Sequence, residues 1–191
     1  MHLYVIRHGQ TTGDVEDRYG GSYDDHLTPL GISQAKTMAE SMLDKNIEII
    51  FVSPLIRAQE TAKILHDTLQ VEVKTIEDIR ERNQNGILSG MIRSEAKLKY
   101  PELAEKVNNP LNTIEGAESF DDFRKRILAA INSVVESGYE TVAVVTHGGP
   151  MRRIMENLLN LTPDAKIEDC GWMLLDYKEG KYELVKKVGI S

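Results

Sequence analysis

Short, largely apolar runs alternate with longer amphipathic segments along most of this chain. Apolar runs of this length predict buried strands, and they lie at residues 3–6, 47–52 and 141–145. Residues 71–76 alternate between apolar and polar side chains, which is typical of a strand with one buried face. These four strands would be separated by amphipathic segments.

The amphipathic segments have apolar residues three and four positions apart, which predicts helices. Thr28 before Pro29 predicts the start of the first one, because a threonine can cap a helix whose first residue is proline. Ser119 is expected to cap the longest helix, and Gly138 to end it. The expected helices cover residues 29–42, 55–69, 93–99, 120–135 and 150–159.

Strands that alternate with helices are typical of an α/β fold. We expect a three-layer α/β/α sandwich with a mainly parallel sheet, built as a single domain over residues 1–191. Residues 9–27 are expected to form a loop, and residues 77–117 an irregular insertion with many glycines and prolines. A hairpin at 172–177 and 181–188 would end the chain.

Composition narrows the functional classes. The 191 residues are 41% hydrophobic and 28% charged, with a net charge of −7, which argues against a general nucleic-acid-binding protein. The single cysteine, Cys170, excludes an internal disulfide and fits a reducing compartment. We see no signal peptide and no apolar stretch of roughly 20 residues. We therefore expect a cytoplasmic protein with no membrane partner, and we leave a homodimer open. His2, His26 and His66 lack metal-ligand spacing, so we expect no metal, and we expect no cofactor.

Three predicted strands end in side chains that suit a phosphoryl group. His8 follows the first strand, Arg57 the second, and His147 the strand at 141–145. The carboxyl ends of parallel strands lie at one edge of a sheet, where α/β proteins bind ligands. With Arg7, two histidines and two arginines would face one crevice. A neutral imidazole is a competent nucleophile, and guanidinium groups stabilise transferring phosphoryl groups.

The chain resembles the histidine phosphatase superfamily, also called phosphoglycerate mutase-like, from Met1 to about Leu159. The resemblance rests on motifs in a fixed order. They are Arg7-His8-Gly9-Gln10-Thr11, Leu27-Thr28-Pro29-Leu30-Gly31, Ser53-Pro54-Leu55-Ile56-Arg57-Ala58, Ile79-Arg80-Glu81, Gly116-Ala117-Glu118-Ser119 and Val145-Thr146-His147-Gly148-Gly149.

The resemblance implies a role for each matching residue. His8 would become a phosphohistidine and Glu81 would act as acid and then as base. Arg7, Arg57 and His147 would hold the phosphoryl oxygens. The phosphate or substrate would also contact Thr11, Asp14, Gly20, Gly21 and Gly148.

Two positions depart from the family pattern. The family commonly has asparagine where this chain has Asp14, and a carboxylate near a phosphate is unfavourable. The family usually places a glycine four residues after the acid, whereas Gly86 follows Glu81 by five. The loop after Glu81 is therefore expected to bulge.

Three functions fit these residues. The favoured one is a phosphomonoesterase that acts through phosphohistidine on small phosphorylated metabolites. The second is a phosphoglycerate mutase, which the resemblance disfavours because family mutases tend to have asparagine where this chain has Gly149. The third is an inactive module that binds a phosphorylated ligand. Which phosphate ester is bound does not follow from the sequence.

Overall fold

The computed structural model describes residues 1–162 and 165–191. Six strands form one sheet in the order β3-β2-β4-β1-β5-β6. The strands are β1 (His2–Arg7), β2 (Ile49–Val52), β3 (Glu72–Thr75), β4 (Thr141–Thr146), β5 (Ile167–Lys178) and β6 (Lys181–Ile190). The first four are parallel, while β5 and β6 are antiparallel to their neighbours. The expected mainly parallel sheet is confirmed.

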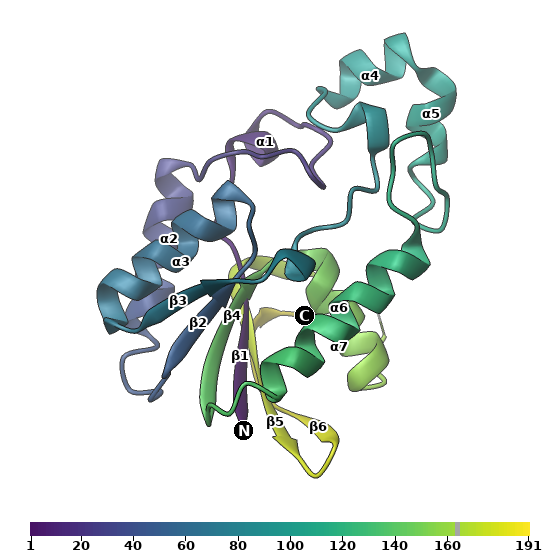
Figure 1. The fold of residues 1–191 in the computed structure, drawn as a ribbon. Coiled ribbons are helices and arrows are strands. Elements are labelled where there is room, and N and C mark those ends of the chain that lie inside the picture. Colours follow the sequence, from purple (N-terminus) through teal and green to yellow (C-terminus); the bar gives the residue numbers. More distant parts are fainter. Residues whose placement is uncertain (163–164) are drawn as a thin grey trace.

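Two pairs of helices cover the two faces of the sheet (Figure 1). On one face lie α2 (Pro29–Glu40) and α3 (Ile56–Leu69), and on the other lie α6 (Phe120–Val135) and α7 (Gly148–Leu158). The three-layer α/β/α arrangement is therefore confirmed. The caps are also as expected, because Thr28 accepts a hydrogen bond from the Gly31 amide and Ser119 accepts one from the Asp122 amide.

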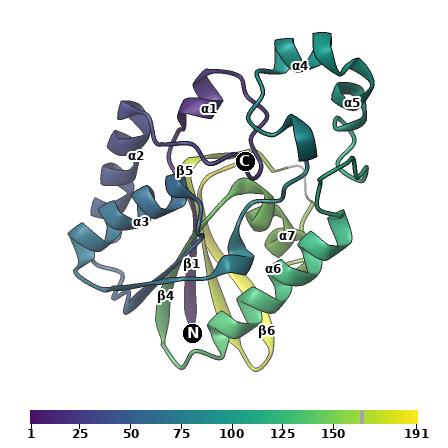
Figure 2. The same cartoon turned by 45° about the horizontal axis from the view of Figure 1, so that its top comes forward.

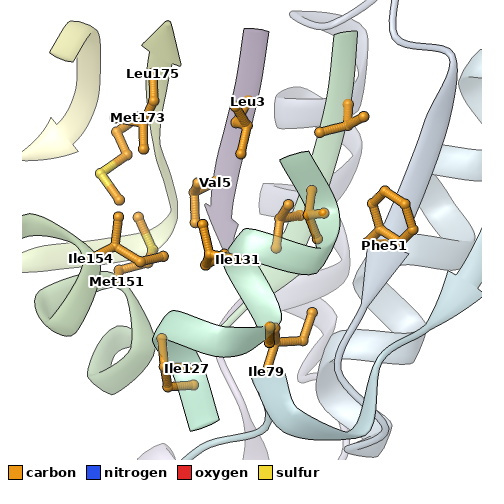
Figure 3. Close-up of a cluster of buried hydrophobic side chains, with 14 of the residues drawn as sticks. Leu3, Val5, Phe51, Ile79, Ile127, Ile131, Met151, Ile154, Met173 and Leu175 are labelled. Carbon is orange, nitrogen blue, oxygen red and sulfur yellow. The ribbon is translucent and has the colours of Figure 1, made fainter. Parts of the chain in front are cut away.

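Alternation along β1 divides the core between the layers. Leu3 and Val5 pack against α6 and α7, in a cluster that contains Ile131, Met151 and Met173 (Figure 3). Tyr4 and Ile6 point to the opposite face and pack among α2 and α3. Successive side chains of a strand point to opposite faces, so one strand with no polar residue in its centre supplies both layers.

The segment expected to be an irregular insertion contains short helices. They are α4 (Arg93–Lys99), which confirms the helix expected at 93–99, α5 (Pro101–Lys106) and the 3₁₀ turns η1 (Glu77–Ile79) and η2 (Gly86–Leu88). α4 and α5 stand above the carboxyl edge of the parallel strands (Figures 1 and 2). Leu88, Ala96 and Ile114 form a small core of their own with Tyr19.

Two expectations need correction. Residues 9–27 are not wholly a loop, because α1 (Thr12–Val15) forms there as a single turn capped by Thr11. β5 also begins five residues before the expected hairpin, at Ile167 rather than Trp172. A register shift between these two residues accompanies the left-handed backbone of Cys170 (φ 55°), and it breaks the apolar alternation. In the described part of the chain, no helix has the length and apolar character of a membrane span.

Candidate active site

The His8 imidazole is held in one tautomer at the end of β1. It is 5% exposed, and its Nδ1 lies 2.8 Å from the Gly9 carbonyl oxygen. A carbonyl can only accept, so Nδ1 carries the proton and Nε2 keeps its lone pair. Burial, followed by the positive charges of Arg57 and Arg7, holds the pKa of His8 well below its usual value. His8 is therefore neutral and nucleophilic at Nε2.

His147 is buried next to His8, with the two ring centroids 5.0 Å apart. Its Nε2 lies 2.7 Å from Ser53 Oγ, and its Nδ1 is the one buried side-chain nitrogen or oxygen without a hydrogen-bond partner among the described residues. Burial and then the Arg57 charge hold the pKa of His147 well below its usual value. If the Ser53 hydroxyl donates to Nε2, the proton of the neutral ring lies on Nδ1, available to an acceptor.

The two arginines reach this centre from different elements. Arg57, in the first turn of α3, donates from Nε to His8 Nε2 at 3.2 Å, and Asp25 Oδ1 accepts from the same guanidinium at 2.9 Å. Arg7, at the end of β1, lies 3.2 Å from Asp169 and donates to the Ile167 carbonyl at 2.6 Å. Each guanidinium is thus also paired with a carboxylate.

Glu81 reaches the amino end of α7. Its Oε2 accepts a hydrogen bond from the Gly149 amide at 2.9 Å, and its Oε1 accepts one from the Arg82 amide at 2.8 Å. A Cβ atom at position 149 would collide with this carboxylate. The lack of a side chain at Gly149 therefore makes room for Glu81, and the extra residue before Gly86 does not carry Glu81 away from the cavity.

One cavity of about 340 Å³ collects most of these side chains. Nine of the ten residues expected at the site line it, and His147 lies buried outside the lining. The nine are Arg7, His8, Thr11, Asp14, Gly20, Gly21, Arg57, Glu81 and Gly148. The juxtaposition expected at the carboxyl edge of the sheet is thus present.

Comparison with known proteins places the chain in a family. The sequence pattern of the histidine phosphatase superfamily (branch 1) matches residues 3–188. The chain belongs to the histidine phosphatase superfamily.

Individual relatives of this histidine phosphatase carry several names. "Putative phosphoserine phosphatase 2" of Hydrogenobacter thermophilus is 31% identical, covering 85% of this chain and 84% of that protein. "Probable phosphoglycerate mutase GpmB" of Yersinia pestis is 30% identical, covering 95% and 87%. The solved structure of a mycobacterial glucosyl-3-phosphoglycerate phosphatase is 25% identical with a TM-score of 0.83, covering 97% of each chain.

In this histidine phosphatase, Asp14 and Thr11 bind one another. Asp14 Oδ2 accepts from the Thr11 amide at 3.0 Å and from the Thr11 hydroxyl at 2.9 Å, and Thr11 in turn accepts from the Asp14 amide. This reciprocal cap makes α1 begin at the cavity wall. Oδ2 of Asp14 is therefore engaged by Thr11. Gly21 contributes to the site through its carbonyl oxygen, which accepts a hydrogen bond from Arg57 at 2.9 Å.

Several side chains at this site were not anticipated from the sequence, among them Arg93 and Arg152, which line the cavity. Asp25 and Asp169 hold the two predicted arginines, and Ser53 was noted within a motif but given no partner. The carboxylates lie 32 and 162 residues from the arginines that they contact. Only Ser53-Pro54, at the end of a predicted strand, carried a local signal.

Proposed function

We propose that this protein is a phosphomonoesterase that acts on small phosphorylated metabolites through a phosphohistidine at His8. The observation that carries the proposal is the unprotonated Nε2 of His8, which faces Arg57 in a cavity that Glu81 also lines. A nucleophile, two cations and an acid at one cavity are the groups that phosphoryl transfer needs.

In the first step, His8 Nε2 attacks the phosphorus of the ester. The P–N bond forms while the P–O bond to the alcohol breaks, and protonated Glu81 gives its proton to the leaving oxygen. In the second step, the Glu81 carboxylate takes a proton from water as the water oxygen attacks phosphorus. The P–N bond breaks, inorganic phosphate leaves, and His8 and Glu81 return to their starting states.

Charge stabilisation comes from fixed donors. In both steps the transferring group carries negative charge on its equatorial oxygens. Arg7 and Arg57 supply guanidinium groups, and His147 supplies Nδ1–H. The backbone amide of Gly148 adds the amino end of α7, an 11-residue helix whose dipole favours an anion. Donors that are already positioned cost no reorganisation at the moment of reaction.

A screen of phosphate esters at mildly acidic and neutral pH, with His8→Ala as the blank, tests this function. We expect phosphate release by the native enzyme and acid-labile phosphate trapped on the protein, both lost in His8→Ala. Tight phosphate binding without turnover or trapped phosphate would instead favour the inactive binding module. The phosphatase names of the Hydrogenobacter and mycobacterial relatives support turnover.

A mutase is the second candidate, since one relative bears the name phosphoglycerate mutase. The intermediate would then return its phosphoryl group to the sugar acid instead of to water. The side chains involved would be the same, namely His8, Glu81, Arg7, Arg57 and His147. Incubation with 3-phosphoglycerate separates the two functions. We expect inorganic phosphate from the phosphatase, and 2-phosphoglycerate would indicate the mutase.

We also propose that the enzyme works in the cytoplasm, without a metal. The single cysteine suits a reducing compartment, and every step above is assigned to a protein side chain or backbone amide. Activity that survives dialysis against a chelator would support metal independence, and restoration of lost activity by a divalent cation would contradict it. A homodimer is testable by light scattering during gel filtration.

A further inference from the structure

A second cavity of about 340 Å³ lies on the other side of Glu81. Glu81, Gln84 and Arg152 line both cavities, so the two spaces share a wall. A Cβ atom at Gly148 would lie 3.2 Å from Arg152 Nη1, which puts this guanidinium at the phosphate side of the wall. Glu81 therefore lies at the boundary between a polar cavity and its neighbour.

Four apolar side chains line the second cavity beside its charged and polar ones. Its lining includes Pro110, Leu111, Phe120 and Phe123. Leu111 is 66% exposed, so its apolar side chain is accessible to a ligand in the cavity. An apolar ligand would cover this surface.

Two of the three arginines that line the second cavity are already occupied, while the third, Arg152, lies at the wall shared with the phosphate cavity. Arg82 donates to the carbonyl oxygens of Glu118 and Pro110, and Arg153 is paired with Glu156. Both guanidinium groups also lie against the Phe120 ring, 5.6 and 4.6 Å from its centroid. Their donors are directed at protein groups, so they offer little to the hydroxyl groups of a polar ligand.

We propose that this cavity binds the leaving alcohol of the substrate, and that it selects monoesters whose alcohol has an apolar body over monoesters of polyols. The inference rests on the proposed function, since Glu81 must protonate the leaving oxygen. An oxygen next to Glu81 lies at the boundary, so the carbon chain attached to it extends away from the phosphate and into the second cavity. Hydroxyl groups placed against Leu111, Phe120 and Phe123 would lose water without gaining partners.

Three esters with alkyl leaving groups test the selection. Ethyl phosphate lacks a body that reaches the second cavity, benzyl phosphate supplies an apolar one, and glycerol 1-phosphate supplies a polar one. We expect kcat/KM for benzyl phosphate to exceed the other two values by about tenfold or more, the scale of one small apolar group in a matching pocket.

The Leu111→Ser variant locates the effect. Its side chain is mostly exposed, so the fold tolerates the change. We expect the ratio of kcat/KM for benzyl phosphate to that for ethyl phosphate to fall at least threefold, with inhibition by inorganic phosphate unchanged, because phosphate occupies the other cavity. Leu98→Ser is the matched control, since Leu98 is 87% exposed in the same insertion and lines neither cavity.

The outcomes are distinguishable. Equal kcat/KM for the three esters, or a preference for glycerol 1-phosphate, would overturn this inference and leave the phosphatase standing. A benzyl preference that survives in Leu111→Ser and in Phe120→Ser would also overturn it. No release of phosphate from any ester would refute the proposed function, and the inference with it.

Discussion

At the scale of single residues, one neighbour decides the chemistry of each histidine. The Gly9 carbonyl accepts from His8, which leaves the lone pair toward the cavity, and Ser53 lies at the Nε2 of His147. In the proposed mechanism these two identical side chains take opposite roles, acceptor of a phosphoryl group and donor to one. The sequence places both histidines at strand ends, but it does not contain the hydrogen bonds that select their tautomers.

Burying both rings in the neutral form makes stability depend on pH. The unfolded histidines gain protons as the pH falls through about 6.5, whereas the folded ones, with lowered pKa values, do not. The unfolded state then binds more protons, so stability is fully present above pH 7 and falls below about 6.5. Below that pH, each histidine lowers the free energy of unfolding by about 1 kcal/mol per pH unit, until the pH reaches the pKa of the folded histidine.

Urea unfolding in phosphate-free buffer between pH 7.5 and 5 measures this dependence. We expect His8→Gln and His147→Gln each to reduce the slope of unfolding free energy against pH by about the amount that corresponds to one bound proton. The slope, not the absolute stability, is compared, because either substitution can also change packing. A slope that matches the native protein in both variants would contradict neutral burial.

Ser53→Ala tests the tautomer of His147. Without the hydroxyl, nothing at Nε2 favours placing the proton on Nδ1, so the donor to the phosphoryl group is lost in part of the molecules. We expect kcat to fall between roughly tenfold and a hundredfold, as for other groups that orient a functional histidine. Unchanged turnover, with an unchanged thermal midpoint, would show that Ser53 does not fix the ring.

At the scale of elements, α6 holds the Glu81 loop by one side chain. Arg126 donates to the carbonyl oxygens of Asp78, Arg80 and Glu81, while its Nε and Nη2 contact the Glu118 carboxylate at 2.6 and 2.8 Å. The backbone that carries the acid is therefore fixed to a helix that packs on the sheet. Glu118, next to the cap residue Ser119, contributes to this anchor.

Arg126→Met is expected to loosen the loop and misplace Glu81. An ester with a poor leaving group needs the acid, whereas 4-nitrophenyl phosphate needs it far less. We therefore expect kcat for benzyl phosphate to fall by about tenfold or more relative to that for 4-nitrophenyl phosphate. Arg126→Lys should restore part of the difference, and equal losses on both esters would indicate a merely structural role.

Strands and helices were predicted well where the pattern repeats, and poorly where it is interrupted. The fully buried run in β4 and the stripe of α6 were both expected. α1 was not, because it is a single turn whose stability comes from the Thr11–Asp14 cap. The start of β5 was not, because polar residues and the left-handed Cys170 interrupt the alternation there.

At the scale of the whole molecule, two segments far apart in sequence, residues 16–23 and 88–107, pack against one another. Tyr19 packs among residues of the insertion, its amide donates to the Met91 carbonyl, and its ring lies 4.4 Å from the Arg93 guanidinium carbon. Such long-range pairing has no local pattern, so the contact between residues 9–27 and 77–117 could not be predicted from the sequence.

Tyr19→Ala is expected to increase the local unfolding of both segments. Tyr19 is 2% exposed, so its loss removes packing from both sides of the contact. Hydrogen exchange followed by mass spectrometry should quicken over residues 16–23 and 88–107, with β1 and β4 still protected. Faster exchange in only one segment would mean that the two do not move as a unit.

The carboxylates that are paired with the two arginines have a consequence for turnover. Asp25 and Asp169 offset part of the positive charge that Arg57 and Arg7 present to an anion. In the proposed reaction, inorganic phosphate is the last species to depart, and two uncompensated guanidinium groups would retain it. We therefore expect the acidic partners to weaken product inhibition and to let the enzyme turn over when phosphate is abundant.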